Sequence, residues 1–486
     1  MVSLRTINVS EIPELLGEWR NGAGSLAERL AAGVEQAIER GELLEHWRLP
    51  SERDLARELG ISRSTTVRSM ELLAERGTVQ RVHGSGTFIA GNRYPSRTSA
   101  LPPSLRLKYQ LGSNTDPGMI AATVPSPSDL PPEALTLSVG ELFEASPGGE
   151  RPGSGYNLAG LADTRRRIAA MLTAQGLPSA AENLIITTGA TQSLSLVFEQ
   201  TLMPGDLVVV ESPSYPTTLD MLRRLGAQIV SVRTGDGSVD SDGLARVALK
   251  ARAKMVVVTT TCNVATGLSA DRAMRNALVG LAQAGVTVVD DLTLADYHPA
   301  PQPDALAAMN DHRNIVSVGS FNKIYWGGLR IGWLRSHPSP VQTFIRAKSK
   351  TDAGSSVPSQ IILSKLLPYH DQIAATRRAQ VAARAHDAAR YLEAELPDWV
   401  IEGAGQGPSM WVRLPVRDSA EFVTFAHARG TSIGYGGMYR SDGRASQHVR
   451  LTLTSGDDQV AAGLSNLRDA WEAFPGRRGS RQGKAR

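Results

Sequence analysis

A lysine stands in an unusual setting within the segment SVGSFNKIYWGGLRIGW, residues 317–333. Lys323 follows Ser320 by three positions and precedes Arg330 by seven, among apolar residues and glycines. Burying an ammonium group is unfavourable, but a lysine kept partly neutral can attack an aldehyde and form a Schiff base. Arg330 can hold a phosphate as a two-pronged fork, and Ser320 can add a hydroxyl. These residue types predict a site for a ligand that is both an aldehyde and a phosphate ester.

An acidic pair completes this set of residues. Asp290 and Asp291 end the run VTVVDD, a predicted strand, and VSVGSF before the lysine is another. The carboxyl ends of strands in open α/β sheets face the ligand crevice. Pyridoxal phosphate (PLP) is an aldehyde and a phosphate ester, and its ring nitrogen needs an acidic partner. A lone lysine would be interpreted as a solvated loop residue, whereas lysine, serine, arginine and acid together indicate PLP.

The elements that must position these residues alternate along the chain. Short Val/Ile-rich runs bounded by turn residues are separated by amphipathic segments, which predicts an α/β domain with a mainly parallel sheet. The last hundred or so residues, about 370–475, predict a smaller α+β subdomain. The strand-like runs are NLIITTG, DLVVVES, AQIVSV, KMVVVTT, VTVVDD and NIVSVGS.

Residues 25–90 have the order helix, helix, tight turn, helix, hairpin, which predicts a winged helix-turn-helix. A recognition helix needs short polar and basic residues in its first turn, which enters the major groove. The unit holds nine arginines, ten acidic residues and no lysine, so a helical protein-interaction domain remains open on composition alone. The residues placed to contact DNA are Arg53 before the turn, Ser62, Arg63, Ser64 and Thr65 at the start of the third helix, and His83 and Gly84 at the wing tip.

The whole chain has 486 residues, 41% hydrophobic and 21% charged, which is ordinary for a globular protein. The single Cys262 excludes an internal disulfide and a multi-cysteine metal site, and we expect no metal. Neither a membrane-spanning run nor a signal peptide is evident, so we expect the cytoplasm. A net charge of +4 permits nucleic-acid contact without arguing for it. We expect a DNA-binding domain at 1–90, a linker at 91–116, an effector domain at 117–475 and a basic tail at 476–486.

The amino-terminal unit resembles a known family. LPSERDLARELGISRSTTVRSMELLAERG and HGSGTFI are similar to the winged-helix domain of the GntR regulators over roughly 65 residues. The resemblance implies that the seven residues named above bind double-stranded DNA. Glu45-His46-Trp47 departs from the family's Pro-Gly turn, in a loop away from the DNA contacts.

From about residue 117 to 475 the chain resembles a fold-type I aminotransferase. SFNKIYWGGLRIGW is similar to the family's lysine segment, which implies that Lys323 is the Schiff-base lysine and that Ser320 and Arg330 hold the phosphate. Further motifs imply further cofactor contacts: Gly189, Ala190 and Thr191 (ITTGATQSL) on the phosphate, Tyr215 (ESPSYPTTLD) on the pyridine ring, Asp291 rather than Asp290 on the ring nitrogen, and Tyr156 (GYNLAGL) on the phosphate of a neighbouring subunit. Arg450, in QHVRLTLTS, is implied to clamp the carboxylate of an effector.

Two positions depart from the aminotransferase pattern. The text NVATG has Val264 where the family has the asparagine of N-P-T-G. Asn263 is one residue away and is the candidate to contact the cofactor hydroxyl in its place. The tyrosine that commonly follows the ring-binding aspartate is replaced by Thr293 and Leu294. Both losses remove hydrogen bonds that tune the cofactor, so we expect retained PLP but impaired transamination.

The order of the two parts resembles the MocR subfamily of GntR regulators. This implies a PLP-dependent transcriptional regulator, rather than an enzyme, in which PLP forms an internal aldimine on Lys323. An amino compound, or PLP itself, would change DNA binding. The resemblance also implies a head-to-tail homodimer on a DNA operator. The alternatives are an active aminotransferase with a fused DNA-binding domain, and a DNA-binding sensor that has lost PLP.

Overall fold

The computed structural model describes residues 7–21, 24–39, 43, 47–76, 78–82, 86–89, 125–138, 140–141, 155–233, 241–299, 301–403 and 407–479. The predicted linker at 91–116 lies outside the described residues, as do His83 and Gly84 of the predicted wing tip and positions 480–486 of the predicted tail.

The amino-terminal unit is a winged helix-turn-helix, as its sequence predicted. Its helices are α2 (Leu26–Glu39), α3 (Glu52–Glu58) and α4 (Arg63–Glu75), and its antiparallel hairpin is formed by β1 (Val79–Val82) and β2 (Gly86–Ile89). Ser51 and Ser62 cap α3 and α4 by accepting hydrogen bonds from the backbone N–H groups three residues on, which satisfies donors that a helix start leaves unpaired. Two short elements that the sequence did not predict precede them, η1 (Val9–Glu11) and α1 (Ile12–Leu16), and add Ile12 and Leu16 to the buried core.

A seven-stranded sheet forms the centre of the large domain, with the order β3-β9-β8-β7-β6-β4-β5. Five neighbouring strands are parallel, whereas β9 is antiparallel to both β3 and β8. All six predicted strands form, and β9 is an additional strand that the sequence reading missed. The strands are β3 (Leu184–Thr187), β4 (Leu207–Ser212), β5 (Gln228–Arg233), β6 (Met255–Val258), β7 (Thr287–Asp291), β8 (Ile315–Ser320) and β9 (Gly332–Ser336).

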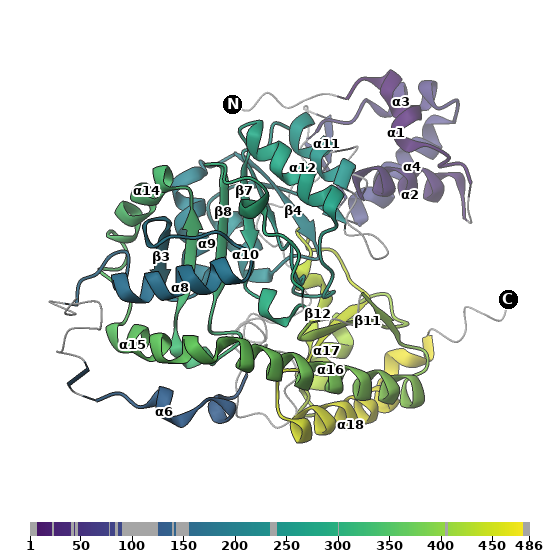
Figure 1. Ribbon diagram of the computed structural model, residues 1–486. Coiled ribbons are helices and arrows are strands. Elements are labelled where there is room, and N and C mark those ends of the chain that lie inside the picture. Colours follow the sequence, from purple (N-terminus) through teal and green to yellow (C-terminus); the bar gives the residue numbers. More distant parts are fainter. Residues whose placement is uncertain are drawn as a thin grey trace.

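Helices cover both faces of this sheet (Figure 1), so its strands are buried on both sides. Val288 shares one buried cluster with Leu278 of α12, and Val289 shares the other with Leu194 of α9, because successive strand residues point to opposite faces. The helices of the large domain are α6 (Pro132–Leu135), α8 (Ala162–Ala174), α9 (Ala190–Thr201), α10 (Pro216–Arg224), α11 (Ser241–Lys250), α12 (Arg272–Gln283), α13 (Leu306–Met309), α14 (Pro338–Lys348) and α15 (Val357–Leu366).

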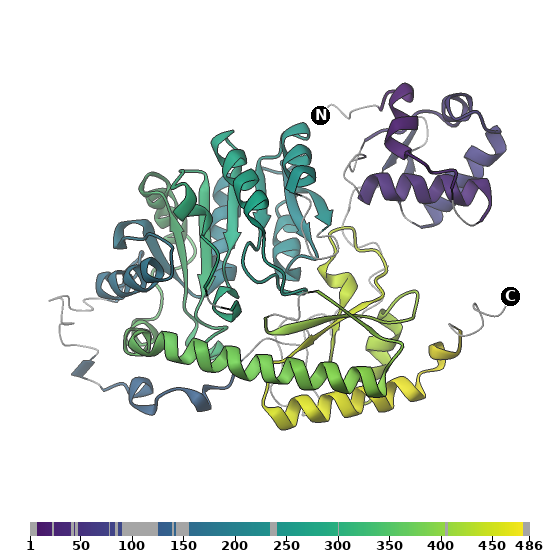
Figure 2. The same cartoon turned by 45° about the vertical axis from the view of Figure 1, so that its right-hand side comes forward.

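A smaller α+β unit completes the chain, as predicted. Its antiparallel sheet has the order β10-β11-β13-β12, formed by Val400–Glu402, Ser409–Arg413, His448–Thr452 and Gly434–Tyr435. Its helices are α16 (His370–Glu395), α17 (Ala420–His427) and α18 (Asp457–Ala473). Figures 1 and 2 show α16 running from beneath the large domain along the small sheet, with α18 beside it.

The winged helix stands to one side of the large domain in Figure 2. Trp47 packs against the edge of the large-domain core, with the Lys250 Nζ atom 5.8 Å from its ring centroid. No helix in the described part of the chain combines the length and hydropathy needed to cross a bilayer.

Candidate functional site

Lys323 lies three residues beyond the end of β8, in the loop that returns to β9. Desolvation is the largest cause that lowers its pKa, to about 8, and the positive charges of Arg450 and Arg330 lower it further, while Asp291 opposes them. A minor but significant share of the Lys323 side chains is therefore neutral near pH 7. A neutral amine is the form that attacks an aldehyde.

A small anion cradle lies at the start of α9. Gly189 precedes that helix with φ of 140°, and a Cβ added to it would lie 2.9 Å from Asn322 Nδ2, 3.8 Å from a terminal nitrogen of Arg330 and 3.9 Å from Ser320 Oγ. Arg330 is exposed, and within the described residues its guanidinium forms no hydrogen bond or ion pair. Backbone amides at a helix start, a hydroxyl and a guanidinium together suit a phosphate group.

The cradle includes one side chain that the sequence reading missed. Asn322 accepts a hydrogen bond from Ile331 N at 2.9 Å and donates one to Thr188 O at 3.4 Å, so it joins the lysine loop to the end of β3. The signal for it was its place two residues after Ser320 in the lysine motif. Ala190 and Thr191 form the first turn of α9, as the ITTGATQSL motif predicts, and Thr191 is exposed there.

Asp290 and Asp291 lie on opposite faces of the sheet. Asp290 is fully buried, accepts a hydrogen bond from Thr260 Oγ1 at 2.7 Å and lies in the field of Arg275. Asp291 lies on the face covered by α9. Burial raises its pKa, whereas the charge of Lys323 favours its ionised form. This arrangement supports the prediction that Asp291, and not Asp290, meets a ring nitrogen.

Asn263 uses its side chain within its own turn. Its Oδ1 accepts from Ala265 N and Thr266 N, and its Nδ2 donates to Pro213 O at 3.1 Å. Its amide lies near Glu211, a buried acid whose pKa is raised to about 8 mainly by desolvation, although the amide lowers it. The predicted contact between Asn263 and a cofactor would therefore require breaking one of these bonds.

Glu211 and Tyr297 are two further residues near the lysine that the sequence reading missed. Glu211 is the penultimate residue of β4 and lies near Asp291, and its raised pKa favours its neutral form at pH 7. Tyr297 lies beyond Thr293 and Leu294, which replace the family's tyrosine. Its hydroxyl donates a hydrogen bond to the backbone carbonyl of Lys323 at 2.8 Å, so it contacts the lysine loop from a different position in the chain.

Arg450 of β13 brings the small subdomain to the site. Its side chain is 4% exposed, its Nε donates to Val264 O at 2.8 Å, and its charge lowers the pKa of Lys323. Tyr215 immediately precedes α10 and is half-buried. Tyr156 is 75% exposed, which suits a residue that serves another subunit, and its predicted role there remains a prediction.

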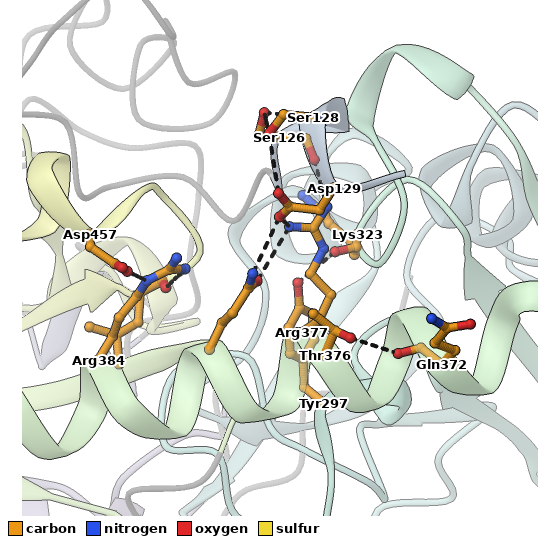
Figure 3. Close-up of polar contacts among 12 residues, drawn as sticks. Ser126, Ser128, Asp129, Tyr297, Lys323, Gln372, Thr376, Arg377, Arg384 and Asp457 are labelled. Atoms are coloured by element: carbon orange, nitrogen blue, oxygen red, sulfur yellow. Dashed lines mark hydrogen bonds and ion pairs between the residues drawn. The ribbon is translucent and has the colours of Figure 1, made fainter. Parts of the chain in front are cut away.

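The segment before α6 is fastened to α16. Arg377 donates hydrogen bonds to Asp129 Oδ2 at 2.6 Å and to Ser126 O at 2.5 Å, and Figure 3 draws these contacts together with Lys323 and Tyr297. A cavity of about 360 Å³ lies there, lined by both elements. In the described residues no group of three or more His, Cys, Asp or Glu side chains is placed to hold a metal.

The predicted DNA contacts lie at the start of α4. Arg63 and Ser64 are exposed there, as is Arg53 at the start of α3. Ser62 Oγ accepts from Thr65 N at 3.1 Å, so the cap holds the first turn in place while Arg63 points into solvent. This arrangement is able to reach a base edge or a phosphate.

The residues present fit PLP. The donors around Gly189 suit its phosphate, the partly neutral Lys323 suits its aldehyde and Asp291 suits its ring nitrogen. The chemistry of this donor set agrees with what the sequence predicts.

Comparisons with known proteins match the two parts separately. Residues 152–457 match the family model "Aminotransferase class I and II", and residues 26–89 match "Bacterial regulatory proteins, gntR family". The HTH-type transcriptional regulator YdcR of Escherichia coli is 26% identical over 88% of this chain and 93% of its own length. The vitamin B6 salvage pathway transcriptional repressor PtsJ of Salmonella typhimurium is 26% identical over 90% and 96%. The structure of LysN, an alpha-aminoadipate aminotransferase of Thermus thermophilus, matches with a TM-score of 0.67 and 21% identity, over 80% of this chain and 99% of LysN.

Proposed function

The chain belongs to the aminotransferase class I and II family, and since a gntR-family domain precedes that region, we infer that it is a PLP-dependent, DNA-binding transcriptional regulator of the MocR architecture. The observation that carries this function is that the cradle at Gly189, with Lys323 and Asp291 beside it, and an exposed polar start of α4 occur in one chain. A DNA reader and a PLP site are therefore both present.

The geometry of the chain's own residues supports the cofactor-binding roles that we propose for them. The α9 start, Ser320 and Arg330 would hold the phosphate, and Asp291 would keep the ring nitrogen protonated. When bound, PLP supplies an aldehyde that reacts with amines and a ring that withdraws electrons. Lys323 presents an amine that is partly neutral near pH 7, because desolvation lowers its pKa and the charges of Arg450 and Arg330 lower it further.

Effector sensing is the finer part of the proposal. An amino compound, or PLP itself, is sensed at this site, and Arg450 binds the carboxylate of an amino-acid effector as a planar clamp. Its Nε is already engaged by Val264 O, which orients the terminal nitrogens. An effector changes DNA binding only through different affinities for two arrangements of the protein. Arg450 supports this because it belongs to the small subdomain, bonds Val264 of the large domain and acts on Lys323 through its charge.

The assembly we propose is a head-to-tail homodimer on a two-part operator. Tyr156 supports it, because this tyrosine is exposed and so is available to a second subunit. The chain just after it is anchored, since Leu161 N donates to Gln360 Oε1 at 2.7 Å. Two winged helices also suit two half-sites.

Aminotransferase activity is the second candidate, favoured by the buried Arg450 near Lys323 and by the fold shared with LysN. The absence of the usual tyrosine at Thr293 and Leu294 counts against efficient turnover.

Footprinting on the DNA upstream of the protein's own gene tests the proposal, with and without PLP and a panel of amino acids. We expect selective protection that changes with PLP or with one amino compound. A Lys323→Ala variant should still bind DNA but lose that response and should carry no cofactor after borohydride reduction. Turnover of amino and keto acids at ordinary enzyme rates, with no selective protection, would favour the enzyme instead.

A further inference from the structure

His370, the first residue of α16, is held at both ring nitrogens. Its side chain is 2% exposed. Its Nδ1 lies 2.8 Å from the Tyr325 hydroxyl, and its Nε2 lies 3.1 Å from Asp296 Oδ1. A histidine fixed at both nitrogens cannot rotate without losing a buried hydrogen bond, which is energetically unfavourable.

One partner, Tyr325, lies in the loop that carries the lysine, and the other, Asp296, lies in a segment that contacts this loop. Tyr325 follows Lys323 by two residues, and its ring is stacked on Phe321 with centroids 5.7 Å apart. Asp296 is followed by Tyr297, whose hydroxyl donates to the backbone carbonyl of Lys323 at 2.8 Å. His370 therefore contacts the lysine loop through Tyr325. Through Asp296 it also contacts the segment whose Tyr297 hydroxyl bonds the Lys323 carbonyl.

Other charged groups surround this contact. Gln175 Nε2 lies 2.8 Å from His370 Nε2, the ring nitrogen that also faces Asp296, and donates to Asp296 Oδ1 at 3.3 Å. Arg378 donates to the backbone oxygen of Asp296 at 2.9 Å. Desolvation alone would lower the pKa of His370, and Arg378 acts in the same direction, but Asp296 and Asp371 outweigh them and raise it. Burial likewise opposes ionisation of Asp296, but His370, Gln175 and Arg378 together outweigh it, so the pKa of Asp296 is lowered. The two groups thus favour an ion pair.

We infer that His370 is a positioning residue for Lys323, which ties the lysine loop to the first turn of α16 through Tyr325 and Asp296. The placement of the lysine is thereby coupled to the placement of the helix that carries the small subdomain. This inference deepens the proposed function and rests on it, since Lys323 is the residue that meets the cofactor there.

The test measures the lysine itself in apoprotein, so it does not depend on activity. Competitive acetylation with acetic anhydride across a pH series, followed by mass spectrometry of the Lys323 peptide, gives the pKa of that amine. Tyr325→Phe removes only the hydroxyl that contacts His370. Its matched control is Tyr391→Phe on α16, the helix that begins with His370. The Tyr391 hydroxyl is buried and has no hydrogen-bond partner among the described residues. His370→Asn is the second variant.

A loosened loop admits water to Lys323, and desolvation is the main cause of its low pKa. We therefore expect Tyr325→Phe and His370→Asn to raise the acetylation midpoint by ~0.5 pH unit or more, and Tyr391→Phe to leave it unchanged. A folded Tyr325→Phe protein with the wild-type midpoint overturns the inference. If one variant does not fold, the other decides by the same midpoint. Failure of the proposed function appears separately, as wild-type protein that retains no PLP after borohydride reduction.

Discussion

Gly189→Ala is the sharpest perturbation of the phosphate cradle. An alanine at φ of 140° occupies a region that only glycine adopts readily, at about 1–3 kcal/mol of strain. The added Cβ would lie 2.9 Å from Asn322 Nδ2 and push that side chain away from its bond with Ile331 N, which adds about 1 kcal/mol. We expect the free energy of unfolding to fall by roughly 2–4 kcal/mol.

The same substitution should weaken PLP binding, because the methyl group enters the space shared by Ser320 and Arg330. Loss of one charge-assisted hydrogen bond, about 1.5–3 kcal/mol, corresponds to roughly 10- to 150-fold in affinity. Absorbance titration of apoprotein with PLP measures this, and urea unfolding measures the stability. Gly205→Ala is the control, since Gly205 also has a positive φ but a Cβ there meets nothing within 4 Å. Wild-type PLP affinity in folded Gly189→Ala protein would refute the cradle.

Three further outcomes follow from the described contacts. The folded-state pKa of His370 is raised above 6.5, so protonated His370 stabilises the fold below that pH, and this stabilisation is lost as pH rises through the folded-state pKa. The difference in unfolding free energy between wild type and His370→Asn should therefore shrink from pH 6 to 9. A constant difference would contradict this. Arg63→Ala should weaken operator binding by about 1–3 kcal/mol without changing PLP absorbance, whereas Arg57→Ala, which removes an exposed arginine paired with an aspartate, should not; gel-shift titration compares them. Trp471→Ala should lower the free energy of unfolding by about 3–5 kcal/mol, because Trp471 is 1% exposed within an aromatic cluster; urea unfolding that shows less than about 1 kcal/mol would contradict this.

The sequence allowed the lysine site to be predicted because its residues belong to short continuous motifs. Lys323, Ser320 and Arg330 lie within eleven positions of one another, and Asp291 closes a strand of evident apolar pattern. The winged helix was equally readable, since its caps and apolar spacings are local. The roles of these residues in binding PLP and DNA are the ones that the experiments above test.

Other features depended on contacts that the sequence does not display. Strand β9 was missed because it is short and begins with a glycine inside the lysine motif, and only its pairing with β3 and β8 identifies it. Tyr297 reaches the carbonyl of Lys323 from 26 positions away. His370 was hidden for the same reason: its partners are 45 and 74 residues distant. Asn263 was proposed as a cofactor ligand from its neighbourhood in sequence, whereas its bonds to its own turn appear only in the fold.

The length of α16 has a mechanical consequence. Its 26 residues make one continuous rod of about 39 Å, and the rod begins at the histidine that is bonded next to the lysine. A tilt of about 5° around that end sweeps the opposite end through roughly 3 Å, and α18, packed alongside, is carried with it. A small change of helix direction at the His370 end therefore corresponds to a displacement of several ångströms at Glu395, the opposite end of the same helix.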